Sequence, residues 1–141
     1  MFTELPTSGL VVLLGAPASG KSTFADLAFA RGDVIATDDI RGLAGGSRDA
    51  LEATPESIDI LYTIVRHRLR IGLFTVVDST GTTEGLLGRL ADLAEATSSP
   101  IHYIHVEAPV NGYSQFDVMS GAELGVHAAR RAALRRRIRA L

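Results

Sequence analysis

The fold is decided by one stretch near the amino terminus, Leu10-Val11-Val12-Leu13-Leu14-Gly15-Ala16-Pro17-Ala18-Ser19-Gly20-Lys21-Ser22. Its first five residues form an unbroken apolar run, which is typical of a strand buried on both faces of a parallel sheet. After the glycine-rich part, apolar side chains recur at helical spacing over residues 21–30, and Gly32 is a plausible stop. The stretch therefore predicts a buried strand, a tight loop and a helix in succession.

The loop between this strand and this helix matches the pattern G-x-x-x-x-G-K-[ST] at every fixed position. In such a loop the backbone N–H groups and the helix N-terminus form a site for phosphate. We predict that a nucleoside triphosphate is bound by Gly15, Ala16, Pro17, Ala18, Ser19, Gly20, Lys21, Ser22 and Thr23. Lys21, the only lysine in the chain, would neutralise the β- and γ-phosphates, and the hydroxyl of Ser22 would be a ligand of Mg²⁺. The alternative, a glycine-rich turn without a ligand, is disfavoured by the strand and helix on either side.

Apolar runs and helical patterns alternate along the rest of the chain. Further strands are expected at 34–36, 73–78 and 101–106, and further helices at 54–70, 83–96 and 121–141. The polar stretch 37–48 is expected to be a loop or a short helix, and 111–120 is the least regular part. This alternation predicts the α/β class, as a three-layer P-loop NTPase fold with a mostly parallel sheet of four to five strands.

The composition is that of one globular domain. A length of 141 residues, with 46% hydrophobic and 21% charged residues, suits a single domain over 1–141. No apolar run approaches the ~18 residues that span a bilayer, and no signal peptide is recognisable, so we expect a cytoplasmic protein without a membrane partner. The absence of cysteine excludes disulfides and thiolate zinc sites. The oligomeric state is left open.

Charge is unevenly distributed along the chain. Six of the 14 basic residues lie within 130–139, whereas all 16 acidic residues lie at or before Glu123. The basic tail could contact phosphates or nucleic acid, or it could be a solvated helix face that offsets an acidic body.

Acidic side chains follow two of the predicted strands. Asp78 ends the third strand, and Asp38 and Asp39 follow the second. Because ligands of open α/β sheets bind outside the carboxyl ends of the strands, Asp78 could hold Mg²⁺ directly or through water. Asp38 or Asp39 could accept the proton of an attacking hydroxyl, and Arg41 could grip the acceptor. Each acid could instead cap a turn, and the pattern alone does not choose between Asp38 and Asp39.

Other functional interpretations are weaker. The chain has no N-K-x-D motif for guanine, and its glycine spacing does not fit the dinucleotide pattern G-x-G-x-x-G. His102 and His105 have opposite parity on one strand and are expected on opposite faces, while His67 is expected on a helix surface. No histidine is therefore predicted to have a role.

Four segments, 10–25, 34–42, 58–72 and 75–80, carry a likeness to a known family. In order and spacing the chain resembles, over about residues 9–108, the kinase domain of polynucleotide 5′-hydroxyl kinases, most closely that of bacterial polynucleotide kinase-phosphatase RNA-repair enzymes. It is also similar to the wider group of P-loop kinases that includes zeta toxins. The pair of motifs V-I-x-x-D-x-x-R and V-V-D-x-T is more specific than the loop alone.

This resemblance implies a kinase that uses ATP and Mg²⁺, with the 5′-OH end of RNA or DNA as its acceptor. It implies that Asp38, and not Asp39, is the general base and that Arg41 contacts the acceptor's phosphate. It also implies that Lys21 and Ser22 serve ATP and magnesium.

The resemblance weakens after residue 109. The family carries Arg-Asn-x-x-Arg in a lid whose arginines clamp the phosphates of ATP, whereas residues 110–117 contain no arginine. We expect 110–141 to be a divergent lid and C-terminal helical region in which Arg130, Arg131 or Arg135 supplies the clamp. Two alternatives to a polynucleotide kinase stay open: a P-loop kinase of a small molecule (a sugar, nucleotide sugar or antibiotic), and a nucleotide-binding module with weak or no catalysis. The choice between ATP and GTP is not predicted by any segment.

Overall fold

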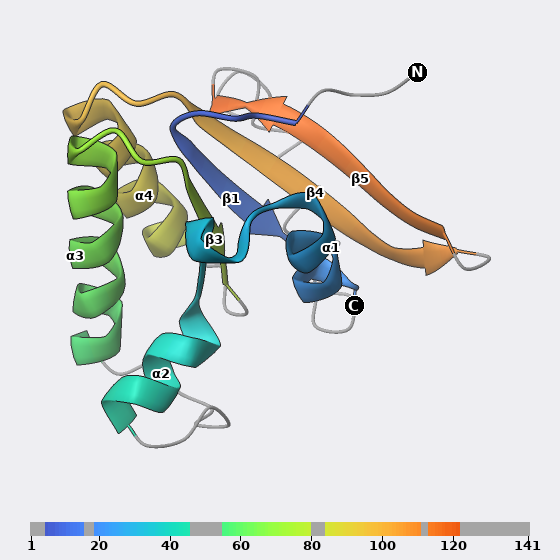
Figure 1. Cartoon of the computed structure of the whole chain (residues 1–141), viewed down its shortest axis with the longest axis horizontal. Coiled ribbons are helices and arrows are strands. Elements are labelled where there is room, and N and C mark those ends of the chain that lie inside the picture. Colours follow the sequence, from blue (N-terminus) through green and yellow to red (C-terminus); the bar gives the residue numbers. More distant parts are fainter. Residues whose placement is uncertain (1–4, 16–18, 46–54, 80–83, 111–112, 122–141) are drawn as a thin grey trace.

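A computed structural model describes residues 5–15, 19–45, 55–79, 84–110 and 113–121 of the chain (Figure 1). The elements along these residues are β1 (Leu10–Leu14), α1 (Lys21–Ala28), the 3₁₀ helix η1 (Arg31–Asp33), β2 (Val34–Ala36), α2 (Thr37–Gly45), α3 (Pro55–Arg70), β3 (Thr75–Asp78), α4 (Glu84–Ala96), β4 (Ile101–Val110) and β5 (Tyr113–Ser120). The predicted α/β class is confirmed.

The strands form one sheet in the order β2-β3-β1-β4-β5. β1 pairs in parallel with β3 and with β4, β2 pairs in parallel with β3, and β5 is antiparallel to β4. β1 therefore lies in the middle of a mostly parallel sheet, which explains its unbroken apolar run, because all five of its residues are 0% exposed. Full burial of one Val or Leu side chain stabilises a fold by about 1.5–3 kcal/mol, so β1 is a large part of the core.

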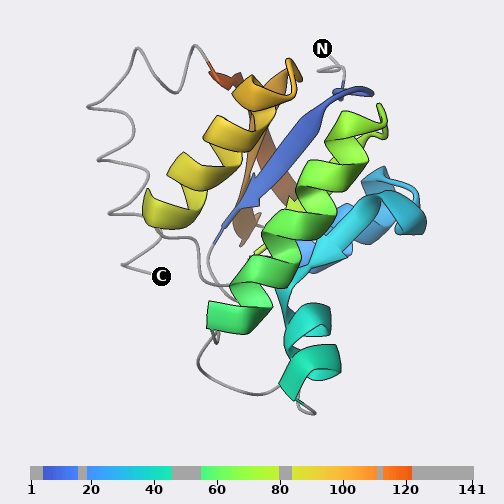
Figure 2. The same cartoon turned by 90° about the vertical axis from the view of Figure 1, so that its left-hand side faces the viewer.

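Helices cover both faces of this sheet. α3 and α4 lie on one face and α1 on the other (Figures 1 and 2). The residues of β1 divide between the two sides because successive side chains of a strand point to opposite faces. Leu10, Val12 and Leu14 join the apolar cluster that includes α3 and α4, while Val11 and Leu13 join the cluster that includes α1. The predicted three-layer arrangement is thus confirmed.

The helices follow the predicted apolar spacing closely. α3 begins at Pro55, and its inward residues Leu61, Val65 and Leu69 are buried, with Ile58 packed against the same cluster. The stretch predicted as a loop or short helix contains α2, which starts directly after β2. Within the described ranges, no helix is both long enough and apolar enough to cross a membrane.

Two predicted boundaries differ from the structure, each for a local reason. α1 ends at Ala28, because Phe29 has an extended backbone (φ −130°, ψ 154°) while its N–H still caps the helix. β3 begins at Thr75 and not at Leu73, because the N–H of Leu73 donates to the carbonyl of Arg68 at 2.8 Å. The extended backbone of Phe29 thus ends α1, and the hydrogen bond that caps the end of α3 delays the start of β3.

The expectation of an irregular segment at 111–120 is wrong, because Tyr113–Ser120 forms β5. β4 also runs beyond its predicted end, since its second half pairs with β5 from Val106 opposite Phe116 to Val110 opposite Tyr113. Pairing with a neighbouring strand, and not a regular alternation in its own sequence, makes this segment extended. The first part of the predicted lid region thus belongs to the sheet, while the predicted helix, with Arg130, Arg131 and Arg135, lies outside the described residues.

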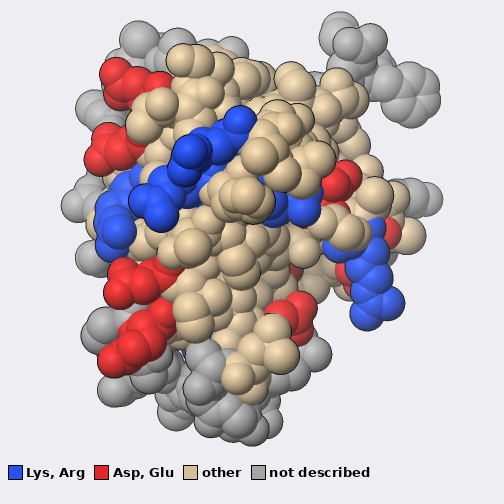
Figure 3. Space-filling view, turned by 60° about the vertical axis from the view of Figure 1, so that its left-hand side comes forward, with Lys and Arg blue, Asp and Glu red and all other residues tan. Residues whose placement is uncertain are grey.

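The surface over α3 and α4 carries charges of both signs. Figure 3 shows a band of basic side chains across this side of the molecule, with acidic side chains around an uncharged area. Arg66 and Arg70 of α3 and Arg89 of α4 are exposed. Although acidic residues outnumber basic ones before residue 130, this surface therefore also carries exposed arginines.

Candidate functional site

The loop after β1 turns back tightly against β4. A Cβ atom at Gly15 would lie 2.7 Å from Ser19 Oγ and 2.8 Å from the carbonyl oxygen of Val106, so a side chain has no room there. Gly20 has a left-handed backbone (φ 88°, ψ 15°), which glycine adopts without steric cost, and α1 begins at the next residue. Both glycines of the motif are therefore required by the path of the backbone.

A buried polar cluster lies where this loop meets the end of β3. Lys21 Nζ is 3.4 Å from Asp78 Oδ1 and donates a hydrogen bond to the carbonyl oxygen of Ser79, while the Ser22 hydroxyl donates to Asp78 Oδ2 at 2.9 Å. The side chains of Lys21 and Asp78 are 5% and 6% exposed. They meet because β1 and β3 are parallel neighbours, with Leu13 beside Asp78. The structure thus brings together Lys21, Ser22 and Asp78, which the sequence predicts as site residues.

The chemistry of this cluster fits a magnesium ion. Oδ1 of Asp78 is buried and accepts no hydrogen bond from the residues that the structure describes. A buried carboxylate oxygen needs a cation beside it, and here the ammonium of Lys21 lies 3.4 Å away; because Oδ1 accepts no hydrogen bond, it is also able to bind a metal ion. In the described part of the chain no group of three or more His, Asp or Glu side chains could hold a metal. Mg²⁺ needs no such group, because it is usually bound by one or two carboxylates, waters and substrate phosphates, so Asp78 and Ser22 would suffice.

Burial also changes the acidity of Lys21. The loss of solvent around its ammonium lowers its pKa, and the nearby charges of Asp78 and Asp38 partly oppose this effect. The opposing effect of Asp38 places this carboxylate within electrostatic reach of Lys21, although the two residues belong to different helices. The charges of Asp78 and Asp38 therefore act in the same direction on this ammonium.

Asp38 is carried to the site by β2 and the first turn of α2. Ala36, the last residue of β2, lies beside Asp78 in the sheet, and α2 starts at the next residue. Asp38 Oδ1 accepts a hydrogen bond from Arg41 Nη2, one helical turn later, and the two form an ion pair. Asp38 is half-buried whereas Asp39 is exposed. The fold thus turns Asp38, and not Asp39, towards the interior.

Of the remaining predicted phosphate-binding residues, the structure describes Ser19 and Thr23. Ser19 is 1% exposed within the loop, and Thr23 is exposed in the first turn of α1. Ala16, Pro17 and Ala18 lie outside the described residues.

Two contacts in and near the site are not predicted from the sequence. Ser79 takes part through its backbone carbonyl, which every residue type possesses, so no sequence signal could identify it. Arg68, which the helical pattern groups with surface residues of α3, is only 18% exposed and pairs with Asp33 just before β2. A clue existed in the sequence, since Arg68 lies three positions after Val65 and seven after Leu61, beside the inward stripe of α3.

The chain is similar to a known family and to solved structures. A family model described as an AAA domain, AAA_33, matches residues 10–115. The structure of a Pnkp1/Rnl/Hen1 complex contains a chain that is 22% identical with a TM-score of 0.52, and the match covers 77% of this chain and 38% of that chain. The crystal structure of APE1195 is also 22% identical with a TM-score of 0.52, and the match covers 72% of this chain and 62% of that chain.

These likenesses to solved structures concern the fold. The match takes in less than two thirds of the length of either solved chain. No curated protein matches the sequence.

Proposed function

We propose that this chain, which belongs to the AAA_33 family of AAA domains and is a P-loop kinase-like protein, transfers the γ-phosphate of ATP to the 5′-hydroxyl of an RNA or DNA end. The observation that carries the proposal is the half-buried pair of Asp38 and Arg41 beside the buried pair of Lys21 and Asp78. The first pair can serve an acceptor hydroxyl and an acceptor phosphate, and the second can serve a triphosphate.

The loop lysine would exchange its protein partners for phosphate when a triphosphate binds. In the structure, the ammonium of Lys21 contacts Asp78 and the carbonyl of Ser79. The β- and γ-phosphates offer it strong anionic acceptors that together carry about three negative charges, as is usual for a P-loop lysine. Once the lysine contacts the phosphates, the carboxylate of Asp78 and the hydroxyl of Ser22 would be the residues that hold Mg²⁺. The ion would neutralise charge that develops on the phosphates during transfer.

In this proposal Asp38 is the general base. The acceptor oxygen attacks the γ-phosphorus while the bond from this phosphorus to the β–γ bridging oxygen breaks, and the hydroxyl proton passes to a carboxylate oxygen of Asp38. The guanidinium of Arg41 already contacts Asp38, so a phosphate bound to Arg41 would bring the neighbouring hydroxyl close to this base.

The paired arrangement favours a polynucleotide over a neutral small molecule. A 5′-terminal nucleotide presents its hydroxyl and, a few bonds away, an anionic phosphodiester, which matches a carboxylate and a guanidinium on one turn of helix. The likeness of the Asp38-x-x-Arg41 segment to polynucleotide 5′-hydroxyl kinases supports the same acceptor. A sugar has no anionic group for Arg41.

Transfer of a labelled phosphate tests this function directly. The protein is incubated with [γ-³²P]ATP, Mg²⁺ and an oligonucleotide with a 5′-OH, and we expect label at the 5′ end. The matched control is the same oligonucleotide with a 5′-phosphate, which has no acceptor and should stay unlabelled. Absence of label, under conditions in which calorimetry shows bound ATP, would contradict the proposal. Competition by a sugar or nucleotide sugar, with label in that compound, would favour the small-molecule alternative.

The affinity for ATP should fall with rising pH before the ordinary lysine pKa of 10.5 is reached. Burial lowers the pKa of Lys21 in the free protein, whereas bound phosphates favour its ammonium form. Below the lowered pKa the ammonium is already present; above it, binding must take up a proton, so the Kd rises with pH. Calorimetry between neutral pH and 10.5 measures this rise.

The control for this pH dependence is Lys21→Arg, because a guanidinium keeps its charge over the whole range. Its Kd for ATP should be weaker at neutral pH but should not rise over the same interval. Parallel pH profiles for the wild type and Lys21→Arg would show that another group causes the effect.

A further inference from the structure

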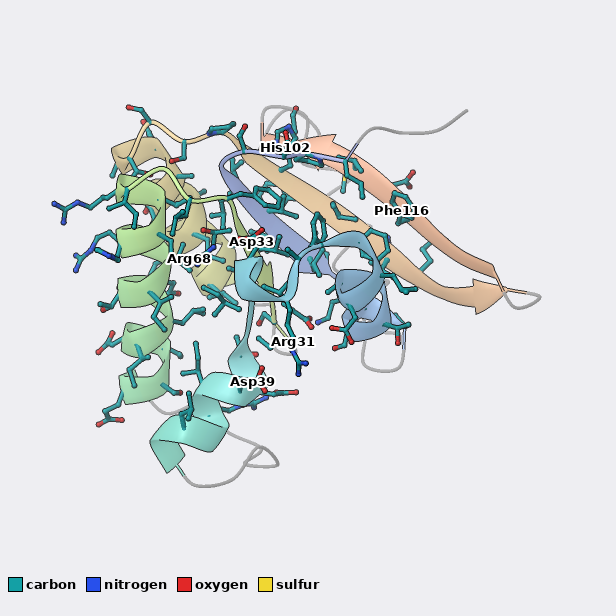
Figure 4. All side chains as sticks on the ribbon, viewed as in Figure 1. Arg31, Asp33, Asp39, Arg68, His102 and Phe116 are labelled. Carbon is teal, nitrogen blue, oxygen red and sulfur yellow. The ribbon has the colours of Figure 1, made fainter. Side chains whose placement is uncertain are left out.

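We propose that Arg68 is a positioning residue for phosphate transfer, because it anchors the short edge strand that carries Asp38 to the site. This role rests on the proposed function. Arg68 lies near the carboxyl end of α3, and its hydrogen bonds are to Asp33, Phe74 and Thr75, not to the described residues of the predicted phosphate site. Figure 4 shows its side chain and that of Asp33 lying close together between α3 and the strands.

Arg68 joins three separate parts of the fold. Its Nη2 donates to Asp33 Oδ1 at 3.1 Å and to the carbonyl oxygen of Phe74 at 2.7 Å, while its Nε donates to Thr75 Oγ1 at 3.2 Å. The hydroxyl of Thr75 donates in turn to the carbonyl of Leu73 at 3.0 Å. α3, the start of β3 and the residue before β2 are therefore held by one guanidinium.

β2 has few other means of holding its place. It has three residues, Val34–Ala36, all only partly buried, and it lies at the edge of the sheet with β3 as its neighbour. Short edge strands have few ladder hydrogen bonds and little buried apolar area, so they are among the parts of a fold that open most easily. An ion pair at Asp33, which directly precedes the strand, fixes the point where the ladder begins.

The position of this ladder decides where Asp38 lies. Val34 is beside Val76 and Ala36 is beside Asp78, so the strand that Arg68 anchors ends next to the magnesium-binding candidate. α2 follows without a connecting loop, and Asp38 is its second residue. A shift of β2 along or away from β3 therefore moves Asp38 relative to Lys21 and Asp78. Misplacement of a reacting group by about 1 Å can cost on the order of 10²-fold in rate.

The planar fork of arginine suits this role better than a lysine would. Three acceptors in different directions are reached by Nε and Nη2 of one rigid group, whereas an ammonium is a single point charge on a flexible stem. The ion pair is only partly buried, with Arg68 18% and Asp33 36% exposed, so its electrostatic energy alone is small. The ion pair therefore matters to the site because it fixes the position of β2, not because of its energy.

The test combines transfer kinetics with hydrogen exchange in two pairs of variants. Asp33→Ala removes only the anchor of β2, and Arg68→Ala removes all three contacts. Asp92→Ala and Arg66→Ala are the matched controls, since both residues are exposed on α4 and α3. We expect Asp33→Ala and Arg68→Ala to lower kcat for 5′-OH labelling by about 10–10²-fold, with an unchanged Kd for ATP, and the controls to behave as wild type. Asp33→Glu, which keeps the charge, should restore most of the rate.

Hydrogen exchange reports on the anchor independently of catalysis. Amides of residues 34–45 should exchange faster in Asp33→Ala and Arg68→Ala than in the wild type, while those of α4 should not change. If the amides exchange faster but kcat is unchanged, or if kcat falls without faster exchange in 34–45, the positioning role is overturned. If the wild type itself transfers no label, the proposed function and this role both fail, and the exchange data still show separately whether Arg68 anchors β2.

Discussion

Asp38→Asn is expected to lower the rate of phosphate transfer by about 10²–10⁴-fold while ATP still binds, because a positioned general base contributes a factor of this size. The amide of asparagine has nearly the shape of the carboxylate but cannot take up the proton of the acceptor hydroxyl. Asp38 lies outside the loop that is predicted to bind the phosphates, and its charge raises the pKa of Lys21. Single-turnover labelling of a 5′-OH oligonucleotide, together with calorimetry of ATP binding, separates the two effects.

The adjacent acid provides a close control for this substitution. Asp39 occupies the same first turn of α2 but is exposed, so Asp39→Asn should leave the transfer rate close to that of the wild type. Equal losses in the two variants would show that the charge of the helix start, and not a base at Asp38, controls the rate. Retention of full activity in Asp38→Asn would remove Asp38 from the mechanism.

Lys21→Met is expected to abolish ATP binding and to lower the free energy of unfolding by about 3–5 kcal/mol, the cost of breaking a buried ion pair by removing one partner. Lys21 and Asp78 are 5% and 6% exposed, so the carboxylate would remain buried with its Oδ1 uncompensated. Methionine nearly preserves the volume of the side chain, which limits any cavity. Urea unfolding followed by far-UV circular dichroism measures the stability, and calorimetry measures the binding.

A second substitution distinguishes the charge effect from a packing defect. In Lys21→Met/Asp78→Asn the buried charge is gone, so most of the lost stability should return, whereas ATP binding should not. If the double variant is as unstable as Lys21→Met, packing around residue 21 and not the unpaired carboxylate is the cause, and the ion pair does not have the energy assigned to it.

The local parts of the site are largely predictable from the sequence. The apolar run Leu10–Leu14 with a glycine after it predicts both the central strand and the loop, since a residue buried on both sides must be apolar and a tight loop must lack a Cβ. Pro55 predicts the start of α3, because its backbone suits the first turn of a helix. Asp78 is predictable as a site residue because it follows an apolar strand.

The parts that the sequence analysis misses depend on a partner elsewhere in the chain. β5 is extended because β4 lies beside it, and its own sequence does not alternate clearly. Arg68 has the charge of a surface residue, and only the position of Asp33, Phe74 and Thr75 around it makes it an internal anchor. The partners of Arg68 lie 6, 7 and 35 residues away in the sequence, and no regular helix or strand spacing predicts such contacts.

By itself, the sequence determined that this protein has a phosphate-binding loop between a buried strand and a helix, because glycine spacing and apolar runs act over a few neighbouring residues. Only the tertiary structure decided which acidic residues lie near Lys21. Parallel pairing of β1 with β3 brings Asp78 to it, and pairing of β2 with β3 brings Asp38 close enough for its charge to act on Lys21. Strand order and register set these contacts, and they follow from packing of the whole sheet, which no local pattern contains.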